Sequence, residues 1–103
     1  MDYTVVLSDQ AKEDVSEIYD YIRTVLQSEA NANSVLNRLY AAMDSLSYMA
    51  ESYHLYPNEP WHSLGVRYFS VGNYSVFYTI AATIATVLHV SYGRRNLDNV
   101  LSN

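Results

Sequence analysis

Apolar residues early in the chain recur at helical spacing and predict an amphipathic helix. After a short β-type run at residues 3–7, which we expect to be a strand, the apolar positions alternate in steps of four and three: Ala11, Val15, Ile18, Ile22 and Val25. Ser8 or Asp9 can cap the first turn. Tyr19, Tyr21 and Leu26 widen the apolar stripe, which indicates either a second contact surface or ordinary core packing.

The same spacing returns after a polar link at residues 27–33. The apolar positions of this second segment are Val35, Leu36, Leu39, Met43, Leu46 and Met49. Because the link is short, we expect the two helices to form an antiparallel hairpin.

The period changes to two in the stretch from Val66 to Arg95. Three segments rich in Val, Ile, Tyr, Phe and Thr are separated there by Gly72-Asn73 and by residues 81–83, which predicts an antiparallel meander. A two-residue turn at Gly72-Asn73 sets a register of three pairs: Val71 with Tyr74, Phe69 with Val76, and Arg67 with Tyr78. The expected order is therefore β-α-α-β-β-β, an α+β fold with one sheet.

This register divides the first two strands of the meander into an apolar face and a mixed face. The apolar face carries Phe69, Val71, Val76, Tyr78 and Ile80, and the mixed face carries Tyr68, Ser70, Ser75, Phe77 and Thr79. In the third strand, residues 84–92, simple alternation leaves apolar side chains on both faces, as expected of a central strand. We expect the helices to cover the apolar face and to leave the mixed face for a partner or the tail.

The segment Glu51–Gly65 is irregular, because Pro57 and Pro60 interrupt regular structure. A loop of this length in a small domain is often functional. His62 is a candidate acid or base, since an unperturbed histidine titrates near neutral pH. A loop histidine without a chemical role is the simpler alternative.

Composition narrows the possible functions. The chain has 103 residues, of which half are apolar, so we expect one domain over residues 1–103. It contains no cysteine, and its three histidines lack ligand spacing, so we expect neither a metal site nor a cofactor. No apolar run approaches the roughly 20 residues that span a bilayer, and the N-terminus lacks a secretory signal, which predicts a cytoplasmic protein.

The positive charge is scarce but concentrated. The net charge of −5 argues against the broad electropositive surface of most nucleic-acid binders. Half of the six basic residues are Arg67, Arg94 and Arg95. We expect folding to bring them to one corner of the sheet, which makes them the first candidates for a site. The alternative is a strand end and a tail that are basic without a function.

Three strings carry a resemblance to a known group of proteins. They are residues 64–69 (LGVRYF), residues 71–78 (VGNYSVFY) and residues 89–95 (HVSYGRR). Together with the order of elements, they resemble the RelE/ParE superfamily of bacterial type II toxins over nearly the whole chain. The resemblance implies a microbial ribonuclease-like fold and a cognate antitoxin that wraps and neutralises the toxin.

Members of this superfamily are either ribosome-dependent mRNA endonucleases, like RelE, or ParE-like toxins that act on DNA gyrase. The nuclease reaction needs an acid, a base and a cation on the scissile phosphate. By position, Arg67 matches the strand arginine and Arg95 the post-strand arginine of a RelE-type site. Lys12 is the only lysine and belongs to the first helix, and Val100 and Leu101 stand where a catalytic tyrosine would follow.

These departures favour the ParE-like branch, in which the toxin inhibits growth by binding its target. The first alternative is a ribosome-dependent mRNA endonuclease with a rearranged acid/base pair, His62 or His89 with Tyr92. The second is a relative that only binds an antitoxin. Tyrosine and arginine are enriched at interfaces, and the candidate binding residues are Arg94, Tyr68 and Tyr78.

Overall fold

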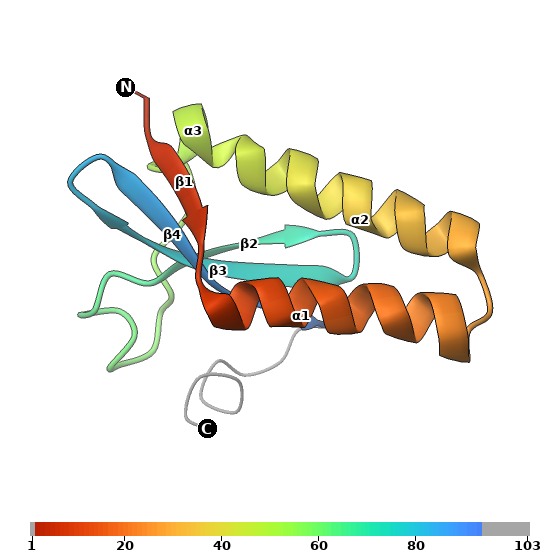
Figure 1. Cartoon of the computed structure of the whole chain (residues 1–103). Helices are drawn as coiled ribbons and strands as arrows, with labels where there is room; N and C mark the ends of the chain where they lie inside the picture. Colours follow the sequence, from red (N-terminus) through yellow and green to blue (C-terminus); the bar gives the residue numbers. More distant parts are fainter. Residues whose placement is uncertain (1, 94–103) are drawn as a thin grey trace.

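A computed structural model describes residues 2–93 of the chain (Figure 1). Its elements follow the order β1 (Thr4–Leu7), α1 (Asp9–Asp20), the π-helical turn η1 (Tyr21–Val25), α2 (Glu29–Asp44), α3 (Leu46–Met49), β2 (Arg67–Val71), β3 (Tyr74–Ala81) and β4 (Ile84–Tyr92). This order confirms the predicted α+β fold.

The four strands form one mixed sheet in the order β1-β4-β3-β2. β1 runs parallel to β4, with Thr4 opposite Ile84, and the other neighbours are antiparallel. The predicted register of β2 and β3 is confirmed, since Arg67 lies opposite Tyr78. Gly72 makes the tight turn possible because its φ of +59° is a conformation that other residues rarely adopt.

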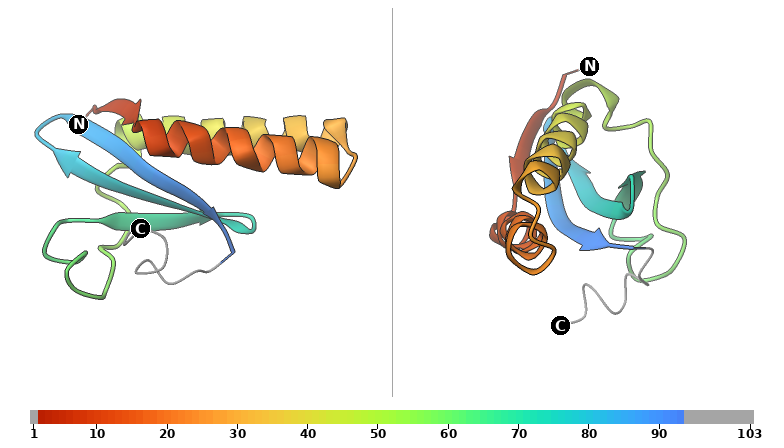
Figure 2. Two further views of the ribbon diagram at one scale, coloured as in Figure 1. Left: turned by 60° about the horizontal axis from the view of Figure 1, so that its bottom comes forward. Right: turned by 90° about the vertical axis from the view of Figure 1, so that its right-hand side faces the viewer.

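The two long helices lie side by side over one face of the sheet, and their far ends extend beyond it (Figure 2). The core between these layers combines residues from both helices with the predicted apolar face of the sheet. Its largest fully buried members are Tyr78, Leu39, Met43, Leu46, Val76 and Val87. Ser28 caps α2 by accepting a hydrogen bond from Asn31 N, so this helix begins inside the predicted polar link at residues 27–33.

A bulge interrupts the pairing of β3 with β4. The register shifts between Phe77 and Tyr78, and the extra residue on β4 is Leu88. Val87 and Val90 are therefore both buried in the core under the helices, whereas Leu88 packs on the opposite face. The simple alternation predicted for β4 holds as far as Leu88 and is wrong beyond it, because the bulge reverses the direction of the later side chains and turns Val90 into the core.

The segment between α3 and β2 fills part of the mixed face of the sheet. Val66 and Phe77 are buried there and form a second, smaller cluster with Tyr56, Trp61, Tyr68 and Leu88. Leu55 also bridges to Arg67 beside the outer edge of β2. The prediction that this face is left for a partner or the tail is wrong for this part, since the chain's own aromatic residues occupy it.

Candidate functional site

Arg67, the first residue of β2, is half-buried and holds the start of the loop. Its Nη1 atom donates to the carbonyl oxygen of Tyr53 at 2.6 Å and approaches that of Glu51 at 3.4 Å. The guanidinium therefore satisfies backbone carbonyls that the irregular chain leaves without partners in secondary structure. In this arrangement Arg67 positions the loop.

Two tyrosines fix the same stretch of backbone. The hydroxyl of Tyr78 donates to the carbonyl oxygen of Ala50 at 2.6 Å, and the hydroxyl of Tyr3 donates to the carboxylate of Glu51. Burial raises the pKa of Tyr78 to about 12, and the hydrogen bond to Glu51 is the main cause of the raised pKa of Tyr3. We call Tyr3, Arg67 and Tyr78 the loop anchor.

The end of β4 lies far from the loop anchor. Gly93 N donates to the carbonyl oxygen of Asn73 at 2.6 Å, so the last described residue adjoins the turn between β2 and β3. Arg67 occupies the other end of β2, roughly 13 Å away at the usual rise of a strand. Arg94 and Arg95 lie outside the described residues, so their proximity to Arg67 stays a prediction.

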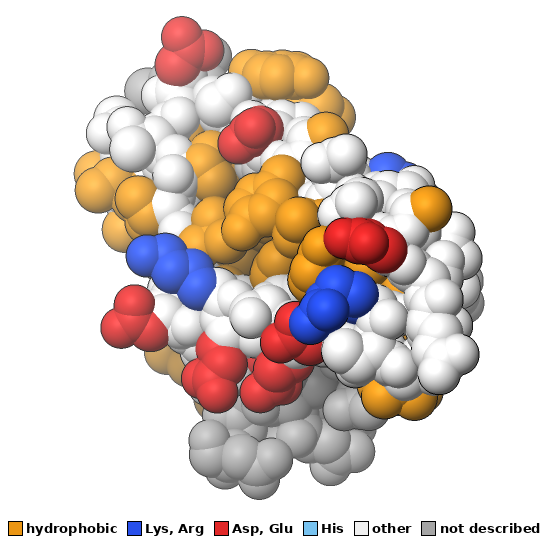
Figure 3. Space-filling model, turned by 45° about the vertical axis from the view of Figure 1, so that its right-hand side comes forward, with side chains coloured by type: hydrophobic (Ala, Val, Ile, Leu, Met, Phe, Trp, Pro, Cys, Tyr) orange, Lys and Arg blue, Asp and Glu red, His pale blue; other side chains and the backbone are white. Residues whose placement is uncertain are grey.

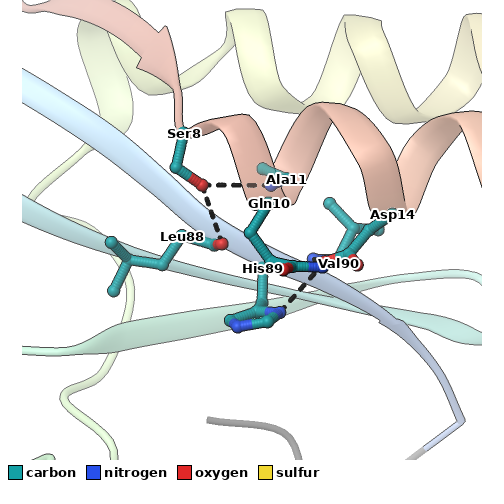
Figure 4. Close-up of polar contacts among 7 residues, drawn as sticks. All are labelled: Ser8, Gln10, Ala11, Asp14, Leu88, His89 and Val90. Atoms are coloured by element: carbon teal, nitrogen blue, oxygen red, sulfur yellow. Dashed lines mark hydrogen bonds and ion pairs between the residues drawn. The ribbon is translucent and has the colours of Figure 1, made fainter. Parts of the chain in front are cut away.

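His89 belongs to a network that joins α1 to the edge of β4 (Figure 4). Its Nδ1 atom lies 3.0 Å from Oδ2 of Asp14, which also accepts a hydrogen bond from Val90 N at 3.0 Å. Gln10 donates to the other oxygen of Asp14 at 2.9 Å. The first turns of α1 thus cover the edge of β4 beyond the end of β1. This pairing could not be predicted from the sequence, because Asp14 and His89 are 75 positions apart in the chain.

His62 and its neighbours lie in the exposed part of the loop. Its Nδ1 atom is 3.1 Å from the carbonyl oxygen of Tyr56. Glu59 accepts hydrogen bonds from the hydroxyl and the backbone N–H of Ser63, and these bonds lower the pKa of Glu59. These contacts join residues no more than six positions apart, and they stabilise the loop itself.

The remaining candidates are aromatic residues in three different surroundings. Tyr68 is half-buried against Tyr56 and Phe77, and Tyr78 is fully buried in the core. Tyr92 is 58% exposed at the opposite end of the sheet. Within residues 2–93, the predicted acids, bases and cations therefore do not converge on one point, and no group of His, Asp and Glu there is arranged to hold a metal ion.

Comparison with protein families identifies the group to which the chain belongs. The family model described as the ParE toxin of the type II toxin–antitoxin system parDE matches residues 5–97. The chain is a member of this ParE toxin family. No helix within the described part of this family member is long and apolar enough to cross a membrane.

Solved structures of toxins share the fold of this ParE-family chain. A chain of the chromosomal ParDE system from P. aeruginosa is 19% identical with a TM-score of 0.75, covering 89% of this chain and 97% of its own. A chain of the RelBE2 complex from Mycobacterium tuberculosis is 19% identical with a TM-score of 0.61, covering 89% and 99%. A chain of the E. coli DinJ–YafQ complex is 14% identical with a TM-score of 0.59, covering both chains fully. A search of curated proteins gives no match.

The ParE-family chain also presents an apolar surface between its two long helices. The hydroxyl of Tyr19 on α1 donates to Oδ1 of Asn33 on α2 at 3.1 Å, which fixes where the helices face each other. Leu36 and Tyr40 follow one and two turns later on this side of α2, and Tyr40 is 43% exposed. We call Tyr19, Leu36 and Tyr40 the interhelical surface. Figure 3 shows a hydrophobic area with Lys or Arg on two sides and acidic side chains both above and below it.

Proposed function

We propose that this chain is the toxin of a type II pair, which an antitoxin neutralises in the cytoplasm. The free toxin arrests growth by binding a cellular target such as DNA gyrase. The observation that carries the proposal is the match of the ParE family model to residues 5–97. The similar folds of chains whose structures are described as ParDE, RelBE2 and DinJ–YafQ pairs support an antitoxin partner.

The geometry of the described residues supports binding in preference to RNA cleavage. Cleavage requires an acid, a base and a cation within hydrogen-bond reach of one phosphate. Arg67 contacts loop carbonyls, His89 contacts Asp14, and Tyr92 contacts Tyr74 at the other end of the sheet. A toxin that works by binding its target needs no such convergence.

Induced expression of the chain without an antitoxin tests this function. After induction we expect growth to stop and the supercoiling activity of DNA gyrase in the cells to fall. The positions of transcript ends should stay unchanged. Growth arrest with normal supercoiling would rule out gyrase as the target. New transcript ends inside translated codons would favour the mRNA endonuclease, and normal growth would favour a non-toxic relative.

The interhelical surface is the part of the molecule that we assign to the antitoxin. We expect an apolar segment of the antitoxin to bind the interhelical surface. This toxin has a net charge of −5, so an acidic antitoxin could not bind it through complementary charge. We expect Tyr40→Ala to weaken antitoxin binding by about tenfold, since exposed tyrosines at the centre of an interface are frequent hot spots. Titration of each purified toxin variant with the antitoxin measures this effect.

Tyr48→Ala is the matched control for this substitution. Tyr48 is 66% exposed on α3, outside the interhelical surface, so its removal should leave the affinity within about twofold of wild type. Equal losses in the two variants would contradict the assignment, because they would indicate a general effect of removing surface tyrosines.

A further inference from the structure

Arg38 on α2 lies directly over the turn between β2 and β3. A Cβ atom added to Gly72 would be 2.6 Å from Nη2 of Arg38, so the guanidinium rests against the glycine backbone. Glycine at this position thus allows both the tight turn and the close approach of the cation. Arg38 therefore lies at the end of the sheet opposite the loop anchor.

Arg38 is exposed, and it forms no ion pair with a carboxylate of the described residues. Among residues 2–93 the ion pairs are Arg23 with Asp20 and His89 with Asp14, and no carboxylate pairs with Arg38. Arg67 also lacks an acidic partner among these residues, but its guanidinium donates to backbone carbonyls of the loop. As far as residues 2–93 are concerned, the guanidinium of Arg38 keeps its donors available for a ligand.

Two tyrosines continue the surface that begins at Arg38. Tyr74 begins β3 two residues after Gly72, against which the guanidinium of Arg38 rests. Burial raises the pKa of Tyr74, and the positive charge of Arg38 opposes this shift. The ring of Tyr74 meets the edge of Tyr92 with centroids 5.4 Å apart, and Tyr92 is 58% exposed. We call Arg38, Tyr74 and Tyr92 the end patch.

A small pocket opens at the same end of the sheet. Its volume is about 110 Å³, and it is lined by Ser70, Gly72, Asn73, Tyr74, Ser75 and Gly93. Tyr74 belongs to both the pocket and the end patch, and Gly72 of the pocket lies against Arg38. A partner that binds the end patch can therefore also insert a small group into this pocket.

We propose that the free toxin binds its target through the end patch, and that the target is a protein whose surface presents a carboxylate beside apolar side chains. The proposal rests on the proposed function, because it names the partner chemistry of the same toxin. Arginine and tyrosine dominate the energetic centres of protein interfaces, and the planar guanidinium binds a carboxylate through two parallel hydrogen bonds. A nucleic acid fits less well, since it requires several cations and the patch offers one.

The end patch is separate from the interhelical surface. Arg38 and Tyr40 are two positions apart on one helix, and they point in nearly opposite directions because each residue turns the helix by about 100°. One toxin molecule therefore has distinct surfaces for its antitoxin and for its target.

A comparison of point variants tests the proposal. Arg38→Glu and Tyr92→Ala are each assayed in the full chain for growth arrest, for binding to purified DNA gyrase and for binding to the antitoxin. We expect both to lose at least about tenfold in gyrase affinity and to arrest growth weakly, with antitoxin affinity within about threefold of wild type. Arg38→Lys keeps the charge but loses the fork, so it should fall between wild type and Arg38→Glu.

Arg23→Glu is the matched control, because it makes the same change of net charge at another exposed helical position. It should arrest growth like wild type. Undiminished growth arrest and gyrase binding by Arg38→Glu would overturn the proposal, as would a loss of antitoxin binding in place of gyrase binding. Reduced binding of a single-stranded oligonucleotide by Arg38→Glu would assign the patch to a nucleic acid and also overturn it.

The failure of the proposed function gives a different result. In that case the wild-type chain leaves growth unchanged and does not bind gyrase, before any variant is compared. Thermal unfolding of Arg38→Glu and Tyr92→Ala checks that both variants are folded, which we expect because both side chains are exposed.

Discussion

Arg67→Met should lower the free energy of unfolding by about 2 kcal/mol and loosen the loop that precedes β2. The substitution keeps the length of the side chain but removes the donors that Tyr53 O and Glu51 O accept from. Hydrogen bonds from charged groups contribute about 1.5–3 kcal/mol, and the carbonyls would lose their partner. Chemical denaturation measures the stability, and limited proteolysis within residues 51–66 measures the loosening.

Arg23→Met serves as the control for this effect. Arg23 forms an exposed pair with Asp20 on one helix, a contact that contributes less than about 0.5 kcal/mol. If Arg67→Met instead kept wild-type stability and loop protection while abolishing growth arrest, Arg67 would act on a target or substrate. This result would return Arg67 to the catalytic role that its position in the sequence suggests.

Alkaline titration should destabilise the protein through Tyr78. Folding raises the pKa of this buried tyrosine from 10.0 to about 12. Between these values the unfolded chain releases the proton and the folded chain retains it, so stability falls as the pH rises through this window. The total loss attributable to Tyr78 is roughly 2–3 kcal/mol, and below pH 10 the contribution is fully present.

Tyr78→Phe removes this contribution and identifies its source. The variant should be less stable by about 1 kcal/mol at neutral pH, because the carbonyl of Ala50 loses its donor, but it should show a shallower decline between pH 10 and 12. The exposed variant Tyr48→Phe should keep the wild-type profile. Denaturation at a series of pH values makes the comparison, and identical profiles for all three proteins would contradict the assignment.

The sequence was a good guide wherever structure depends on neighbouring residues. Apolar spacing located both helices, and the Gly72-Asn73 turn set the register of β2 and β3, since a two-residue turn leaves few ways to pair the strands. Alternation failed in β4 because both of its faces carry apolar side chains. A pattern that is apolar on each side contains no mark of the bulge at Leu88.

The candidate site was harder to predict because its contacts join distant parts of the chain. Nothing near Arg67 in sequence indicates that it meets the carbonyl of Tyr53, and nothing near His89 indicates Asp14. Arg38 resembles any solvated arginine on a helix until the fold places Gly72 beneath it. Residue type thus suggested which side chains are capable of chemistry. The tertiary structure shows which of them already form hydrogen bonds within the chain.

The pairing of β1 with β4 has a consequence for biosynthesis. Ser8 and Leu88, which adjoin where these strands meet, are 80 positions apart in the chain. During translation the backbone N–H and C=O groups of β1 therefore cannot pair with β4 until nearly all described residues have been synthesised. Such a long-range closure slows folding, because the entropy of closing the chain must be lost before the pairing of β1 with β4 contributes stability.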